Sequence, residues 1–220
     1  MKSSKITLKL GFLGDSSVGK TTICLRLLNM DFSENTILTI GNDQLETKFK
    51  LKDGNVIKVI LWDTAGQERF HSAALRILKV VQGIILIFDI TNKKSFENIN
   101  NWLNEIKENF ENPCIILFGN KVDVEKDKWQ ITKEEIEEFS KKMNLTYFET
   151  SAKTNVGINE GFSYIINYIY DQLIQNQVIE NDVIVNNDNI LNRYNNFQIQ
   201  KINKKNDNKD KKCGCAGKKK

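Results

Sequence analysis

The sequence lacks long apolar runs: no stretch of 18 apolar residues occurs, so we expect no membrane-spanning helix. Residues 1–4 lead into a predicted strand without the apolar segment of a signal peptide, and we therefore expect a cytosolic chain. Cysteine is scarce, with four among 220 residues. Cys24 and Cys114 fall in core elements and are expected to be reduced, buried thiols, whereas Cys213 and Cys215 lie alone in a lysine-rich end.

The net charge is small, +4, but it is unevenly distributed. Residues 176–220 contain ten Lys or Arg and five Asp or Glu, a balance of +5, which leaves −1 for residues 1–175. Residues 176–212 also contain eleven asparagines without helical or strand periodicity, which predicts a flexible linker. We therefore expect one folded α/β domain, residues 1–175, and a flexible tail, residues 176–220. A basic tail with cysteines favours an anionic membrane surface over nucleic acid as its partner.

Residues Gly14–Thr21 fit the phosphate-binding pattern G-x-x-x-x-G-K-[ST]. An alternating apolar run precedes them and predicts a strand, and residues 22–30 are predicted to form a helix, which is the setting the pattern requires. In that setting backbone N–H groups point at phosphate oxygens at the positive end of the helix. Lys20 would reach the β- and γ-phosphates and stabilise charge during catalysis. The expected phosphate-binding residues are Asp15, Ser16, Ser17, Val18, Gly19, Lys20, Thr21 and Thr22.

A second motif, Asn120-Lys121-Val122-Asp123, follows another apolar run and selects the base. The Asp123 carboxylate can accept from N1–H and the 2-amino group of guanine, and adenine has neither donor, which would leave the carboxylate unpaired. Asn120 would tie this loop to the phosphate loop, and the stem of Lys121 would cover the base. Farther along, the backbone of Ser151, Ala152 and Lys153 can donate to guanine O6.

The metal and the attacking water involve two further segments. Thr21 and Thr39 would offer their hydroxyls to Mg²⁺, and Asp63 would hold the ion through a water. Gly66 would present its N–H to the γ-phosphate, and Gln67 would orient the attacking water. Phe32, seven residues before Thr39, would pack against the edge of the guanine.

The remaining pattern places these motifs in an α/β fold. Two alternating strands, residues 45–51 and 56–62, flank a hairpin turn at Asp53-Gly54. Ser95 is predicted to cap a helix, and Thr132 with Glu135 a capping box for a helix through residue 143. The order βα, ββα, βα, βα, βα predicts six strands, five of them parallel, with helices on both faces. Ligands bind at the carboxyl ends of such strands, where all four motif loops leave the sheet.

Taken together, the motifs resemble those of Ras-superfamily small GTPases, and most of all the Rab family. The resemblance covers residues 5–175, and the segments that carry it are G-D-S-S-V-G-K-T at 14–21, T-I-G at 39–41, W-D-T-A-G-Q-E-R-F at 62–70, D-I-T-N-K-K-S-F-E-N-I at 89–99, N-K-V-D at 120–123 and E-T-S-A-K at 149–153. It implies the G domain of P-loop NTPases with GTP or GDP and Mg²⁺ as cofactors. It also implies slow GTP hydrolysis in a switch that regulates vesicle traffic.

The same resemblance implies a monomer regulated by other proteins: an exchange factor, a GTPase-activating protein, a GDI-like chaperone and effectors. It implies a lipid anchor at Cys213 and Cys215 on the cytoplasmic face of endomembranes, with no nucleic-acid partner. Two alternatives remain open: a GTP-bound scaffold that does not cycle, and a soluble signalling or transport GTPase without a lipid.

Three stretches depart from the Rab pattern. Residues 42–44 read N-D-Q where V-D-F is usual, and residues 77–81 read I-L-K-V-V where Y-Y-R-G-A is usual. The first stretch looks one residue longer, and we expect Leu45 to take the place of the phenylalanine through a bulge. Of three aromatic residues in the usual recognition surface, only Trp62 is kept, so the identity of the partners is not predicted. Five residues follow Cys215 and form no C-a-a-X box, which leaves prenylation, acylation and no modification open.

Overall fold

A computed structural model describes residues 6–33, 42–64, 79–110 and 113–175 of the chain. Residues Met1–Tyr170 belong to one compact unit, which contains every described strand. Six strands of this part form a single sheet in the order β2-β3-β1-β4-β5-β6. The strands are β1 (Thr7–Leu13), β2 (Asn42–Lys50), β3 (Val56–Thr64), β4 (Gly83–Asp89), β5 (Cys114–Asn120) and β6 (Thr146–Glu149).

Five of these strands run parallel, and β2 pairs antiparallel with β3 at one edge of the sheet. The predicted six-stranded, mostly parallel sheet is therefore confirmed. Strands β4 and β5 are buried almost throughout, as expected for central parallel strands covered on both faces. Because β1, β3, β4, β5 and β6 all end at the same edge, the loops that follow them gather there.

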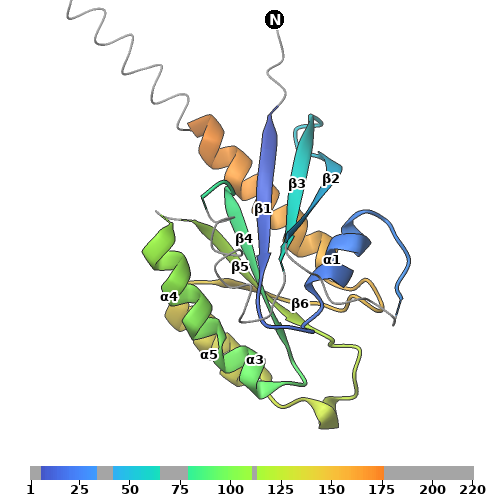
Figure 1. The fold of residues 1–220 in the computed structure, drawn as a ribbon, viewed down its shortest axis with the longest axis vertical. Helices are drawn as coiled ribbons and strands as arrows, with labels where there is room; N and C mark the ends of the chain where they lie inside the picture. Colours follow the sequence, from blue (N-terminus) through green and yellow to red (C-terminus); the bar gives the residue numbers. More distant parts are fainter. Residues whose placement is uncertain (1–5, 34–41, 65–78, 111–112, 176–220) are drawn as a thin grey trace, which may run out of the picture. The chain divides into compact units, whose positions relative to one another are not determined.

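Helices cover both faces of the sheet (Figure 1). Beneath the helices α4 (Ile99–Asn109) and α5 (Lys133–Met143), one core cluster joins Leu86, Leu117, Ile106 and Ile136. On the other face of the sheet, an added Cβ at Gly83 would meet the side chain of Ile165 in the last helix. The last helix therefore packs closely on β4 at this position. The helices are α1 (Lys20–Leu27), α3 (Lys93–Glu97), α4 (Ile99–Asn109), the short 3₁₀ helix η2 (Lys126–Lys128), α5 (Lys133–Met143) and a last helix over residues 158–175.

None of the described helices is long and apolar enough to cross a membrane. The first helix begins two residues earlier than predicted, at Lys20, and ends at Leu27 instead of residue 30. Asn29 stands just beyond it with a left-handed φ of +59°, a conformation that ends helices and that asparagine adopts more readily than most residues.

The β2–β3 hairpin turns at Asp53-Gly54 as predicted, and Gly54 has φ +87°. Its register runs without interruption from Asn42 opposite Thr64 to Lys50 opposite Val56. A bulge would shift the register by one residue along one strand. The predicted bulge is therefore wrong for Asn42–Lys50.

The structure corrects one helix start and confirms another. Asn92, not Ser95, caps α3, because the Asn92 side chain accepts from the Ser95 N–H while the Ser95 hydroxyl accepts from the Asp89 N–H. Asparagine is among the favoured N-cap residues, and the prediction of Ser95 overlooked Asn92 three residues earlier. The capping box of Thr132 and Glu135 at the start of α5 is present as predicted.

Candidate functional site

The loop between β1 and α1 turns around two glycines with left-handed φ angles. Gly14 has φ +141° and Gly19 has φ +102°. A Cβ on Gly14 would lie 2.1 Å from the carbonyl oxygen of Ile87, and one on Gly19 would lie 2.3 Å from Nδ2 of Asn120. Both positions therefore require glycine, for backbone conformation and for the close approach of β4 and of the loop after β5.

Lys20, the first residue of α1, folds back over this loop. Its Nζ donates to the carbonyl oxygens of Gly14 at 2.9 Å and Asp15 at 2.7 Å, and its side chain is buried. Burial lowers the pKa of Lys20 from 10.5 to about 8, and the neighbouring carboxylate of Asp63 opposes that shift. An anion bound beside this ammonium would offset the loss of hydration and favour its charged form.

The other residues of the predicted phosphate loop share this turn. Val18 is buried, Ser16 and Thr22 are half-buried, and Ser17 is exposed with φ +63°. Gly19 occupies the N-cap of α1 and has no side chain to accept from the first-turn N–H groups. The N-terminus of a helix without a side-chain cap favours the binding of an anion.

Asn120 joins three loops. It is 1% exposed, and its Nδ2 donates to the carbonyl oxygen of Val18 at 2.8 Å. Its Oδ1 accepts from the N–H of Ala152 at 3.1 Å. One buried amide side chain therefore fixes the loop after β5 against both the phosphate loop and the loop after β6.

Asp123 and Lys121 lie in the same loop and face different partners. Oδ1 of Asp123 accepts from the hydroxyl of Ser151 at 2.6 Å, which joins the predicted base carboxylate to the loop after β6. Lys121 has φ +72°, and its Nζ pairs with Oδ2 of Asp89 at 2.6 Å. Ser151 and Ala152 are buried, and Lys153 is exposed.

Arg26 is a residue of the site that the sequence analysis missed. Its Nε donates to the carbonyl oxygen of Ala152 at 2.7 Å, and its Nη2 donates to that of Lys153 at 2.8 Å. Its guanidinium carbon lies 5.9 Å from the centre of the Phe32 ring. Phe32 therefore lies near the loop after β6, to which Arg26 bonds. The only local signal was a basic residue in the last turn of α1.

Thr21 and Asp63 bring two predicted metal ligands together. The hydroxyl of Thr21 donates to Oδ2 of Asp63 at 2.6 Å, and Asp63 is 1% exposed. A buried carboxylate and a hydroxyl at this distance supply the hard oxygen donors that Mg²⁺ prefers. The residues present therefore fit the ion.

Asp15 makes contacts that no sequence motif indicated. Its Oδ2 accepts from Nδ2 of Asn98 at 2.6 Å, and its Oδ1 accepts from Nε1 of Trp102 at 3.0 Å. Asn98 stands between α3 and α4, and Trp102 lies in the first turn of α4. The predicted phosphate loop is therefore held from the side of α4 as well as from the loop after β5.

Five predicted site residues lie outside the described part of the chain: Thr39, Gly66, Gln67, Cys213 and Cys215. The structure brings together the remaining predicted residues at the carboxyl ends of β1, β3, β5 and β6.

The cysteines of the described part are free. Cys24 is fully buried, and burial raises the pKa of its thiol, as predicted for a core cysteine. Cys114 is only half-buried, and burial raises its pKa to about 11. Both thiols are therefore protonated and unreactive near neutral pH.

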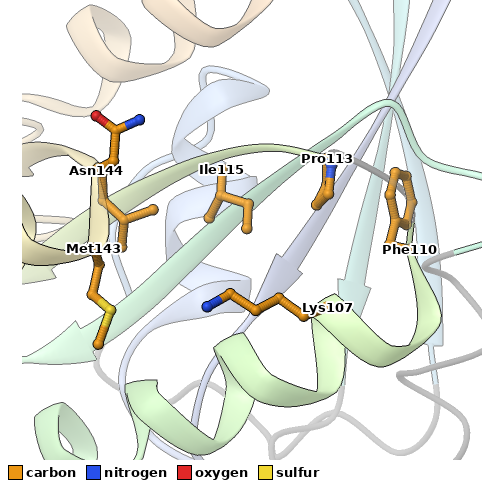
Figure 2. A pocket seen from close by; sticks show the side chains of 7 residues that line it. Lys107, Phe110, Pro113, Ile115, Met143 and Asn144 are labelled. Carbon is orange, nitrogen blue, oxygen red and sulfur yellow. The ribbon is translucent and has the colours of Figure 1, made fainter.

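A pocket of about 510 Å³ lies at the starts of β5 and β6, the strand ends opposite the loops described above. Figure 2 shows the side chain of Lys107 extending along its wall, with Phe110, Ile115 and Met143 around it. None of the predicted nucleotide-binding residues lines this pocket.

Comparison with known proteins relates the whole domain to one family. A family model of the Ras family matches residues 9–171. Rab-13 of Rattus norvegicus is 42% identical over 160 residues, which are 70% of this chain and 76% of the relative. Rab-10 of Diplobatis ommata is 42% identical over 166 residues, covering 73% of this chain and 80% of the relative. The GTP-binding protein ypt2 of Schizosaccharomyces pombe is 38% identical over 178 residues, covering 79% and 86%.

Proposed function

The chain belongs to the Rab family of Ras-superfamily small GTPases, and from this premise we propose a role for each loop of the site. The protein is a Rab-like switch that binds GTP, hydrolyses it to GDP and regulates vesicle traffic. The observation that carries the assignment is Asn120, because its buried side chain bonds to both the phosphate loop and the loop after β6.

In this proposal the phosphates occupy the turn Asp15–Thr22. The first N–H groups of α1 and the ammonium of Lys20 face them. Lys20 then exchanges two neutral carbonyl partners for phosphate oxygens, which are stronger acceptors because they are charged.

Asp123 reads the guanine base. Its carboxylate would contact guanine N1–H and the 2-amino group, and the loop after β6 would contact O6. These two loops already touch, because the carboxylate accepts a hydrogen bond from Ser151. Lys121 would lie over one face of the base, and Phe32 would pack at its edge.

The test is Asp123→Asn. An amide can donate where xanthine presents a 2-oxo group, so the variant should lose affinity for GTP and prefer xanthosine triphosphate. Ser151→Ala is a control, because it removes the hydroxyl partner of Asp123 and keeps the carboxylate. An unchanged preference for GTP in Asp123→Asn contradicts the base assignment.

Thr21, Thr39 and Asp63 would hold Mg²⁺, with phosphate oxygens and waters as its other ligands. When bound there, the ion would supply positive charge that offsets the negative charge developing on the phosphates. The protein's own residues orient the reactants: Gly66 donates to the γ-phosphate, Gln67 positions the water and Lys20 stabilises charge.

Hydrolysis by these groups alone is slow. A GTPase-activating protein would supply about five decades of rate. A measurable rise in hydrolysis with such a protein separates this cycling switch from a permanently GTP-bound scaffold.

The tail, residues 176–220, would link the folded domain to a bilayer through lipids on Cys213 and Cys215. Two lipid chains anchor stably, whereas lysines alone contribute about 1 kcal/mol each near an anionic surface. The protein would then be found in the cytosol and on the cytoplasmic face of endomembranes. An exchange factor, a GDI-like chaperone and effectors would act on a monomer.

Intact mass and membrane fractionation of the full chain from its native cells test the anchor. The wild type should stay on membranes in high salt, and the Cys213→Ser/Cys215→Ser variant should be released. A Cys24→Ser variant controls for the loss of a thiol. A single unmodified mass ending at Lys220 overturns the anchor and favours the soluble alternative.

A further inference from the structure

The phosphate loop carries a negative charge of its own, Asp15. This carboxylate is half-buried, and it lies close enough to Lys20 to oppose the lowering of the Lys20 pKa. A carboxylate beside bound phosphates repels them, and a carboxylate turned toward Lys20 competes with them for the same cation. The direction in which Asp15 points therefore matters for nucleotide binding.

Two donors hold Asp15 on the side of α4. The Asn98 amide and the Trp102 indole N–H each bond to a different oxygen of the carboxylate, at 2.6 and 3.0 Å. Trp102 is buried in the core under α4, so its N–H has a fixed position. The Asn98 side chain makes no capping bond to α4, although Asn98 stands at its N-cap, and it is free to serve Asp15.

The segment that carries these donors is itself fastened to the predicted base loop. Oδ2 of Asp89 pairs with Lys121, and the Ile90 N–H donates to the carbonyl oxygen of Asn120 at 3.1 Å. The hydroxyl of Ser95 accepts from the Asp89 N–H, which fixes the start of α3 to the end of β4. Residues 89–102 thus form a brace from the base loop to the phosphate loop, along α3 and the start of α4 (Figure 1).

We propose that Asn98 and Trp102 are positioning residues for nucleotide retention: they hold the Asp15 carboxylate away from Lys20 and the phosphates, and so keep GDP release slow. The proposal rests on the placement of the phosphates at Asp15–Thr22. Without the two donors, the carboxylate can turn toward Lys20, whose Nζ already bonds to the Asp15 carbonyl, and phosphate binding becomes weaker.

The experiment measures the dissociation rate of a fluorescent GDP analogue from the full chain. Trp102→Phe keeps an aromatic ring and removes the N–H, and Asn98→Leu keeps the approximate shape and removes the amide. Each change should speed release about tenfold, as for the loss of one hydrogen bond to a charged group. Asn109→Leu, at the far end of α4, removes an amide that donates to the Glu105 carbonyl, away from Asp15, and should leave the rate unchanged.

The deciding arm repeats both substitutions in an Asp15→Ala background, where there is no carboxylate to release. There, Trp102→Phe and Asn98→Leu should change the rate by less than about twofold, because their effect acts through Asp15. Equal acceleration in both backgrounds means that damaged packing is the cause, and it overturns the proposal. So does an unchanged rate in both single variants.

If Trp102→Phe fails to fold, Asn98→Leu alone decides between these outcomes. Failure of the proposed function looks different, because the wild type would then bind no GDP at all. If wild type binds GDP and its release rate equals that of Asn98→Leu, the positioning role is rejected and the proposed function is not.

Discussion

The buried ammonium of Lys20 predicts that GDP affinity falls as the pH rises through the pKa of this side chain. In the nucleotide-free protein the pKa of Lys20 is about 8, lowered from 10.5 by burial. With phosphate bound, an anion faces the ammonium, and its pKa rises again. Binding therefore takes up a proton whenever Lys20 is neutral beforehand.

The size of the effect follows from that pKa. With a pKa of about 8, about nine tenths of Lys20 is charged at about pH 7 and one tenth at about pH 9. GDP affinity should accordingly fall about tenfold between these two pH values, or about 1.4 kcal/mol. Titration calorimetry with GDP and Mg²⁺ at several pH values measures it, and the proton uptake appears as a dependence on the ionisation heat of the buffer.

Lys20→Arg is the matched control, since a guanidinium stays charged throughout this range. It should bind GDP more weakly because its larger planar fork does not fit the place of the Lys20 ammonium beside the phosphates, but its affinity should not fall with pH as that of wild type does. Any pH dependence that remains in the Lys20→Arg variant comes from other titrating groups of the protein or the nucleotide. A wild-type affinity that is flat from about pH 7 to about pH 9, or that falls equally in Lys20→Arg, refutes the reasoning.

The same pKa has a consequence for folding, with the opposite sign. Because the pKa of Lys20 is lower in the folded than in the unfolded chain, the unfolded chain binds more protons between about pH 8 and 10.5. The unfolding free energy of the nucleotide-free protein should therefore rise with pH across that window, by at most about 3 kcal/mol. The difference in unfolding free energy between wild type and Lys20→Met isolates this contribution, because methionine does not titrate.

Two further predictions concern hydrolysis and stability. Gln67→Leu should leave GTP affinity nearly intact and reduce hydrolysis, because only the positioning of water is lost; single-turnover assays with and without an activating protein check this, and a wild-type rate in both contradicts the role. Thr132→Ala should lower the unfolding free energy by about 1 kcal/mol through the loss of the α5 cap, with GDP affinity unchanged, while Thr132→Ser should keep most of the stability. Equal stability of the alanine and serine variants would show that the cap contributes nothing.

The sequence could predict those parts of the site whose position is determined by the carboxyl end of a strand. Each nucleotide motif follows an apolar run, and parallel strands deliver the loops that follow them to one edge of a sheet. This is why Lys20, Asp63 and Asn120 could be expected near one another although they are far apart in the sequence. The bond between Asn120 and Ala152 follows from the same rule, because β5 and β6 are neighbours. The bond to Val18 does not, because β4 lies between β1 and β5.

The parts that sequence could not predict depend on side chains that reach across elements. Arg26 bonds to a carbonyl 126 residues away, and nothing in the periodicity of α1 distinguishes it from a solvated arginine. The prediction of one helix capped by Ser95 also missed the division into α3 and α4 at Asn98. The predicted bulge failed for a related reason, since the length of a loop does not say where an extra residue is accommodated.

Among the described residues, two connections join the base loop to the phosphate loop. One is internal, from Asn120 to Val18, and the other is the brace from Lys121 and Asp89 to Asn98, Trp102 and Asp15. With both present, a ligand that orders one loop also orders the other, so contacts to the base reduce the entropy cost of binding the phosphates. Cutting either connection leaves the second in place, and cutting both should weaken GDP binding by more than the two separate losses combined.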